Sequence, residues 1–272
     1  MTMNLARGLA VLAITTLAVL TNGARAHDEA TDQEEVLVQG QRWDELQVYV
    51  RTLSEAGPTD QLARWMTYVC TSVIGVLPEH AEMISRRIAA LTEALDLDPA
   101  PKRCDPKLTI IFSSEADATA AQLADTYTVA LGTGGRGKLV AFADSDAPVR
   151  WVNIVNECGE GCGLMNSRIR QATTPAFSLM LVVVDNTALA GFDVREIADY
   201  LAMVALTSPS QTRRHAKTSV LSMFERERRP GAMFGLTAWD QAYLDALYDL
   251  ESNLNEKQQR ERIEMAMRDA LE

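Results

Sequence analysis

The sequence contains little histidine, the residue that zinc-dependent hydrolases use most often to hold their metal. It has three histidines, His27, His80 and His215, and their spacing matches no usual zinc pattern. The G-x-S-x-G motif of serine hydrolases is also absent, and no cysteine has a histidine in a supporting context. The sequence therefore offers no recognisable catalytic constellation of metal, serine or cysteine type.

Long apolar runs are also missing after the first 26 residues, and no later stretch approaches the roughly twenty residues of a membrane helix. Residues 1–26 combine Arg7, an apolar core over 8–20 and an Ala24-Arg25-Ala26 cleavage motif. This pattern is typical of a signal peptide, with a retained signal anchor as the alternative. We expect a periplasmic or secreted protein with no membrane span after cleavage, beginning with a flexible arm over 27–43.

Basic residues are outnumbered, with 26 Lys and Arg against 37 Asp and Glu and a net charge of −11. An acidic surface argues against nucleic acid as a partner. The run 132–138 has the G-x4-G-K frame of a phosphate-binding loop, but Leu139 stands where Ser or Thr is needed. We interpret the run as a flexible connection between a helix ending at Gly132 and a strand over 138–143.

Four cysteines, an even number in an exported chain, predict two disulfides among three possible pairings. The favoured pairs are Cys70 with Cys104 and Cys158 with Cys162. The first would tie a helix to the loop before a strand, and the second would close a tight loop. A four-cysteine zinc site and a reactive redox pair at the 158–162 loop are the alternatives.

The apolar patterning predicts an α/β (α+β) fold with a helical N-terminal section over 44–98 and an α/β domain over 107–272. Between them, three prolines interrupt residues 96–106. Helices are expected over 44–56, 59–74, 78–95, 114–131, 193–206, 237–248 and 253–272, and strands over 107–113, 138–143, 149–155 and 179–184. Asp193 with Glu196, and Thr237 with Asp240, have the spacing of helix-capping pairs. The last helix is expected to dock on the domain, or to bind a partner.

Residues 178–248 are predicted to form, in this order, a buried strand, a helix, a short turn with Ser222-Met223 and a closing helix. This order resembles the C-terminal part of metzincin-type zinc peptidases and of related bacterial zincin-like proteins. In that family the helix carries H-E-x-x-H-x-x-G-x-x-H, and a methionine turn lies beneath the metal. The resemblance extends over about seventy residues and implies a zincin-like domain with a small mixed sheet and a central helix.

The resemblance places Arg195 and Asp199 at the first two histidine positions, Glu196 at the glutamate and Ala205 at the third histidine. Met223 takes the position of the methionine turn. Because every histidine position is replaced, the resemblance implies neither a bound metal nor another cofactor. Arg195 and Asp199 lie four residues apart, so they are expected to form an ion pair in the space of the metal or on the surface.

These features lead to the hypothesis of an exported, non-catalytic zincin-like protein that binds a protein or peptide partner or acts as a scaffold in the cell envelope. The first alternative is a metal-free or atypical peptidase that uses Glu196, with Glu160 as a second carboxylate. The second alternative is a purely structural envelope protein.

Overall fold

The structure is a computed structural model that describes residues 42–53, 61–156, 175–226, 234–251 and 254–272, without the side chains of 128–134. The chain divides into two units, residues 1–44 and 45–272. Of the first unit only residues 42–44 are described, and they are helical. The second unit begins with helical residues 45–53 and contains every other element below.

A four-stranded mixed sheet lies at the centre of the second unit, with strand order β1-β2-β4-β3. The strands are β1 (Thr71–Ile74), β2 (Leu108–Ser113), β3 (Val149–Asn156) and β4 (Ala176–Asp185). β1, β2 and β4 run parallel, and β3 pairs with β4 in the antiparallel direction. The predicted fold class, α/β (α+β), is confirmed, as are the predicted strands over 107–113, 149–155 and 179–184.

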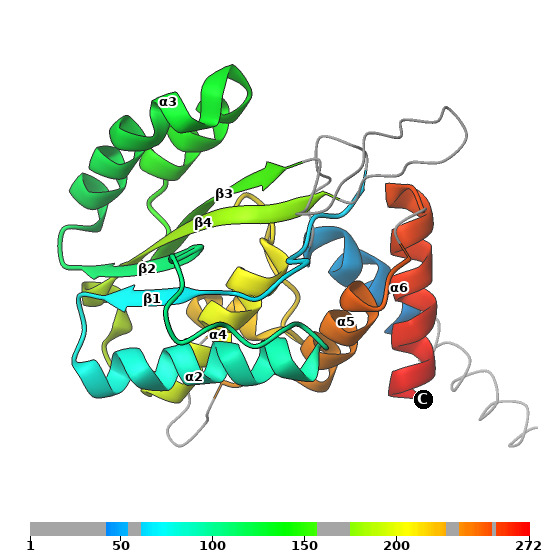
Figure 1. Ribbon diagram of the computed structural model, residues 1–272. Helices are drawn as coiled ribbons and strands as arrows, with labels where there is room; N and C mark the ends of the chain where they lie inside the picture. The colour runs from blue at the N-terminus through cyan, green and yellow to red at the C-terminus, as the bar shows by residue number, and fades with distance from the viewer. Residues whose placement is uncertain (1–41, 54–60, 157–174, 227–233, 252–253) are drawn as a thin grey trace, which may run out of the picture. The chain divides into compact units, whose positions relative to one another are not determined.

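One face of the sheet is covered by α3 (Ala116–Ala143), which lies along it in Figure 1. The contact is made by small side chains near the start of the helix and by larger ones near its end. Leu139 and Phe142, three residues apart, are buried against Val152 and Leu181. The predicted strand over 138–143 and the helix end at Gly132 are therefore wrong, because residues 116–143 are helical and these two apolar side chains are spaced to pack on the sheet from one face of a helix.

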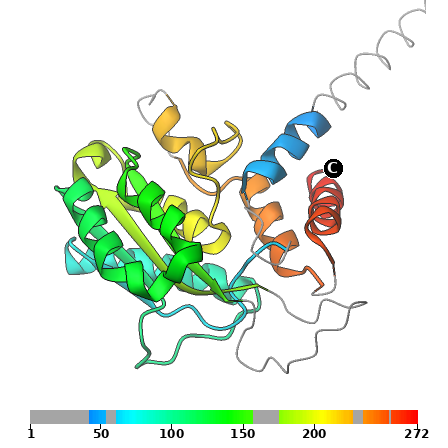
Figure 2. The same ribbon diagram turned by 90° about the horizontal axis from the view of Figure 1, so that it is seen from above.

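The opposite face is covered by α2 (Pro78–Ala94) and α4 (Val194–Thr207), which pack against each other. Figure 1 shows α3 above the sheet and α2 and α4 below it, and in Figure 2, which looks down from above, α3 lies in front of the sheet. Both helices begin near the positions that the sequence predicts, and Asp193 and Glu196 form the expected capping box of α4. In α4, every residue from Tyr200 to Thr207 is buried, so α4 is the central helix of the unit.

The predicted helix over 59–74 is wrong. Residues 61–70 are described and contain no helix, and β1 pairs in register with β2 from Thr71↔Leu108 to Ile74↔Ile111. Upstream, Arg64 makes an isolated parallel bridge to Ala176 of β4. Pairing with strands distant in sequence thus overrides the helical spacing of the local apolar residues. The predicted helical section over 44–98 therefore contains the strand β1 as well as helical residues and α2.

Two short 3-10 helices and two α-helices complete the unit: η1 (Asn186–Leu189), η2 (Val220–Glu225), α5 (Ala238–Tyr248) and α6 (Glu256–Leu271). α5 begins at the predicted capping pair Thr237 and Asp240. α6 packs against α5 through a stripe that includes buried Ile263 and Met267, so the predicted docking of the last helix is confirmed. Within the described ranges, no helix combines the length and hydropathy needed to span a bilayer.

The predicted disulfide between Cys70 and Cys104 is present. It joins the residue before β1 to the segment before β2, where Lys107 N and Leu108 N both donate to Cys70 O. The cross-link therefore fixes the entry of two neighbouring parallel strands. Cys158, Cys162 and Glu160 lie outside the described residues, as do the predicted signal peptide and most of the N-terminal arm.

Candidate functional site

The first turn of α4 holds Arg195 and Glu196, two of the residues that the sequence places at the candidate site. Asp193 caps the helix by accepting from Arg195 N at 2.9 Å, and Glu196 Oε2 accepts from Asp193 N at 2.7 Å. This reciprocal bonding satisfies backbone donors that a helix start leaves without partners. Glu196 is therefore part of the helix start itself.

The second oxygen of Glu196 also bonds to the backbone. Glu196 Oε1 accepts from Phe234 N at 2.6 Å, which joins α4 to the segment before α5. The side chain is 1% exposed. A general base must reach the proton it removes, and here both carboxylate oxygens are directed at main-chain N–H groups in the protein interior.

Asp199, one turn further along α4, binds the same segment. Its Oδ2 accepts from Leu236 N at 3.1 Å, and its Oδ1 accepts from Arg87 Nε of α2. Between the two bonded amides lies Gly235, where an added Cβ would stand 3.0 Å from Asp199 Oδ2. We call Glu196, Asp199 and residues 234–236 the α4 clamp, because two carboxylates hold this segment against the helix.

Arg195 takes no part in the α4 clamp. Its side chain is 66% exposed and forms an ion pair with Asp193 at 3.0 Å, which raises the pKa of the guanidinium. Asp199 pairs with Arg87 instead, so the expected Arg195–Asp199 ion pair is wrong. The physical reason is that the capping carboxylate lies within reach of Arg195, while α2 supplies Asp199 with a nearer cation.

Met223 lies in η2, is 1% exposed, and belongs to an element that packs against α4. The contact between the two elements is aromatic, with the Phe224 ring 5.1 Å from that of Tyr200 and 5.2 Å from that of Phe192. Burial and the nearby Glu225 charge raise the pKa of Tyr200, so its hydroxyl stays neutral. The turn, the helix start and the α4 clamp thus form one packed region.

Among the described residues, no three His, Cys, Asp or Glu side chains come together in a way that could hold a metal ion. Ala205, which the sequence comparison places at the third histidine position, is fully buried, as is Ala202. The Ala205 carbonyl accepts from Trp65 Nε1 at 2.8 Å. This part of α4 is occupied by core packing.

A second feature, which the sequence did not predict, lies at the outer edge of β3. Among the described residues β3 has β4 as its one strand partner, so its other edge is left without a strand. There the Gln211 side chain accepts from Trp151 N at 3.1 Å and donates to Trp151 O at 2.8 Å. One amide side chain thereby makes both hydrogen bonds that a neighbouring strand would make at this residue.

A hollow of about 330 Å³ lies along this edge. Asn153 crosses it, donating to Ser208 Oγ at 2.6 Å and accepting from Lys138 Nζ at 3.3 Å. Ser208 has a left-handed backbone with φ 48° at the C-terminus of α4, which turns the chain towards β3. We call the hollow and the outer edge of β3 the β3 groove. Its lining residues are Lys138, Ala141, Ser145, Asp146, Trp151, Val152, Asn153, Ser208, Pro209, Gln211 and Thr212.

The polar link over 208–217, which follows α4, has a structural role that was not predicted from its sequence. His215 is half-buried, and burial lowers the pKa of its imidazole despite the nearby Glu225. Gln211 and His215 both lie in this link, whose polar and basic residues are typical of a solvent-exposed connection. An amide side chain that completes a sheet edge has no sequence signature, because its partner lies sixty residues away.

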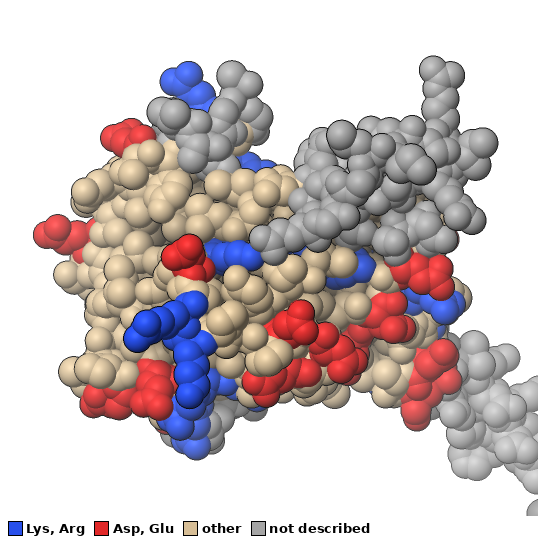
Figure 3. Space-filling view, in the orientation of Figure 1, with Lys and Arg blue, Asp and Glu red and all other residues tan. Residues whose placement is uncertain are grey.

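Charges of both signs are mixed on the face of the molecule that Figure 3 shows. In the view of Figure 3, Asp and Glu side chains are interspersed with Lys and Arg rather than gathered into one basic patch. On α2, for example, Arg86 lies 3.7 Å from Glu82 on an exposed face. Such exposed pairs add little stability.

Comparison with known proteins identifies no relative: no family model, curated protein or solved structure matches the chain.

Proposed function

We propose that the chain is an exported, non-catalytic zincin-like protein that binds an extended segment of a partner protein along the β3 groove. The observation that carries the non-catalytic part is the bonding of Glu196, whose two oxygens accept from Asp193 N and Phe234 N. A glutamate held in this way stabilises the fold and cannot activate water without breaking the α4 clamp.

The zincin-like part of the proposal is supported by the arrangement of the last third of the chain. Strand β4 leads into α4, the Met223 turn packs against α4, and α5 follows. This is the order in which the sequence resembles the metzincin-type peptidases. The resemblance concerns architecture, while the residues at the metal positions have other contacts.

The binding part is supported by the hydrogen-bonding state of β3. Alternate residues of an edge strand direct their N–H and C=O groups outward, so Asn153 faces the same way as Trp151. Gln211 fills one such position with a side chain, which a peptide backbone can replace with equivalent bonds. Addition of a strand to an exposed sheet edge is a general mode of peptide recognition.

The test of binding uses peptides selected from a random displayed library on the purified protein. Asn153→Pro removes the outward N–H, and an edge strand tolerates proline at such a position. Asn153→Ala is the matched control, because it loses the same side-chain contacts but keeps the N–H. We expect the selected peptides to bind the alanine variant and not the proline variant. Equal binding to both variants would refute recognition through the edge of β3.

The test of the enzyme alternative is hydrolysis of a broad peptide mixture in the presence of added zinc. We expect no cleavage above that of a protein-free control. Cleavage that is abolished by Glu196→Gln, with the variant still folded by circular dichroism, would favour the peptidase and overturn the non-catalytic assignment.

A further inference from the structure

A cavity of about 600 Å³ opens where the three parallel strands end, at a distance along the sheet from the β3 groove. Val76 follows β1, Phe112 lies near the end of β2, and Asn186 follows β4. The remaining lining comes from the first two turns of α2, from the first turn of α4 and from the connection between β4 and α4. These residues are His80, Ile84, Leu189, Ala190, Phe192, Asp193, Val194 and Ile197.

The position of the cavity follows from the course of the chain. After β1 and β4 the chain turns to α2 and α4 on one face, whereas after β2 it turns to α3 on the other face. Neighbouring connections that diverge to opposite faces leave a crevice beyond the carboxyl ends of the strands, which is where open α/β sheets bind ligands.

Two glycines shape the walls of this cavity. Gly75, with φ 85°, brings the chain so close to β2 that an added Cβ would stand 2.0 Å from Phe112 O. Gly191, with φ 86°, directly precedes Phe192. Both are left-handed backbone positions that favour glycine. They set the paths of Val76 and Phe192 along the cavity.

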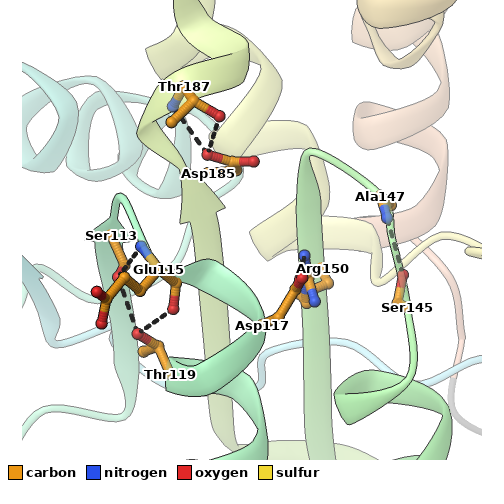
Figure 4. A network of polar contacts seen from close by, with 9 residues as sticks. All are labelled: Ser113, Glu115, Asp117, Thr119, Ser145, Ala147, Arg150, Asp185 and Thr187. Atoms are coloured by element: carbon orange, nitrogen blue, oxygen red, sulfur yellow. Dashed lines mark hydrogen bonds and ion pairs between the residues drawn. The ribbon is translucent and has the colours of Figure 1, made fainter.

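Figure 4 shows the polar contacts on the α3 side of the same sheet end. Asp185 Oδ1 accepts from Thr187 N and Oγ1 at 2.8 and 2.7 Å, which lowers the pKa of this carboxyl. Buried Arg150 donates to Asp117 Oδ1 at 2.8 Å, and Glu115 N donates to Ser113 Oγ. The cavity itself lies on the side of α2 and α4, which supply part of its lining.

We infer that this cavity binds a small, neutral amphipathic molecule with an apolar body. Its volume lies within the roughly 300 to 1,000 Å³ of small-molecule sites, and its lining is mainly aliphatic and aromatic with few polar groups. His80 and Asn186 supply hydrogen-bonding groups at the rim that orient a polar end. The carboxylate of Asp193, already bonded to Arg195, makes a second anion unfavourable there.

The experiment titrates the full chain with 1-aminoanthracene, a neutral amphipathic fluorophore, and follows its fluorescence. We expect saturable binding at one site per chain. Ala190→Trp places a large side chain in the cavity from an exposed position and is expected to weaken binding by about tenfold or more. Met265→Trp on α6, where Met265 is 51% exposed, is the matched control and keeps the binding of the parent protein.

Circular dichroism and thermal unfolding establish that each variant is folded. If Ala190→Trp does not fold, Leu189→Trp tests the same wall. Absence of saturable binding to the parent protein, or equal affinity in the parent and a folded cavity-filling variant, would overturn the inference. Peptide binding at the β3 groove is expected to be unchanged in the cavity variants.

Discussion

The α4 clamp and the β3 groove differ in how their polar groups are satisfied. In the clamp, Glu196 and Asp199 bond to backbone N–H groups and a paired arginine, with Glu196 almost fully buried. In the groove, a strand backbone is satisfied by Gln211, a side chain from an exposed position. Buried carboxylates with fixed donors contribute stability, whereas an edge covered by one replaceable amide leaves room for a partner.

The closest internal parallel to the clamp is Asp240, which is fully buried. It accepts from Tyr49 Oη, Ser219 Oγ and Val220 N at 2.7, 2.7 and 2.8 Å. Burial and this carboxylate together raise the pKa of Tyr49. Asp240 thus joins the helix over 45–53, η2 and α5 in the way that the clamp joins α4 to 234–236.

The largest effect is expected for Asp240→Ala. The change leaves several buried donors without an acceptor and is predicted to lower the free energy of unfolding by about 4 kcal/mol. Urea denaturation measures it. Asp245→Ala, an exposed change on the same helix, is the control and is expected to stay within about 0.5 kcal/mol of the parent. Equal losses of stability in Asp240→Ala and Asp245→Ala would mean that the buried carboxylate contributes no more to stability than the exposed one.

Loss of the Cys70–Cys104 bond comes next. The bridge closes a loop with a sequence separation of 34, so Cys70→Ala combined with Cys104→Ala is predicted to cost about 3 to 4 kcal/mol. Thermal and urea unfolding of the parent and the double variant measure this loss. If the unfolding midpoint of the double variant equals that of the parent, the starts of β1 and β2 are held in place without the disulfide.

Within the clamp, Glu196→Gln is expected to lower stability by about 2 kcal/mol, because an amide cannot accept at both of its ends and one backbone donor loses its partner. The control is Arg195→Ala, whose exposed pair with Asp193 is worth less than about 1 kcal/mol. If the two variants unfold at the same denaturant concentration, Glu196 has no structural role.

Two glycine substitutions are predicted to act in opposite directions. Gly235→Ala brings a Cβ against Asp199 Oδ2 and is expected to destabilise by about 1 kcal/mol. Gly137→Ala lies within α3, where an added Cβ meets nothing within 4 Å, and is expected to stabilise by up to about 1 kcal/mol. Thermal unfolding of both variants, compared with the parent, measures the difference in sign.

The smallest effect concerns pH. Burial lowers the pKa of His215 in the folded state, so the unfolded chain binds a proton more readily. Stability from this residue is therefore full above the ordinary histidine pKa of about 6.5 and falls as the pH drops through that value. His215→Gln is expected to reduce the loss of stability between about pH 7 and pH 5. An identical pH profile in parent and variant would contradict the buried, neutral imidazole.

The sequence predicted those helices and strands whose apolar residues have the same spacing as the residues that are buried in the structure. Strands β2, β3 and β4 and helices α2, α4, α5 and α6 agree in this way, and the capping boxes of α4 and α5 were readable because their partners lie three residues apart. The errors lie where distant contacts decide. β1 forms because β2 pairs with it, and α3 continues through a glycine-rich run because Leu139 and Phe142 reach the sheet.

In the candidate site, too, the local contact was predicted from the sequence, and the contacts between distant residues were not. Glu196 was correctly placed in a capping pair, but its bond to Phe234 N joins residues 38 positions apart and has no local signal. The pairing of Asp199 with Arg87 of α2 likewise depends on how two helices pack. The β3 groove went unpredicted, since the role of Gln211 depends on the position of a strand sixty residues earlier.

Native-state hydrogen exchange of the Phe234 and Leu236 amides, resolved by NMR, tests the central claim most directly. If the α4 carboxylates serve as backbone acceptors, both amides exchange slowly in the parent, Glu196→Gln selectively exposes Phe234, and Asp199→Asn selectively exposes Leu236. Rapid exchange of both amides in the folded parent, with no response to either substitution, would mean that Glu196 and Asp199 are free for another purpose.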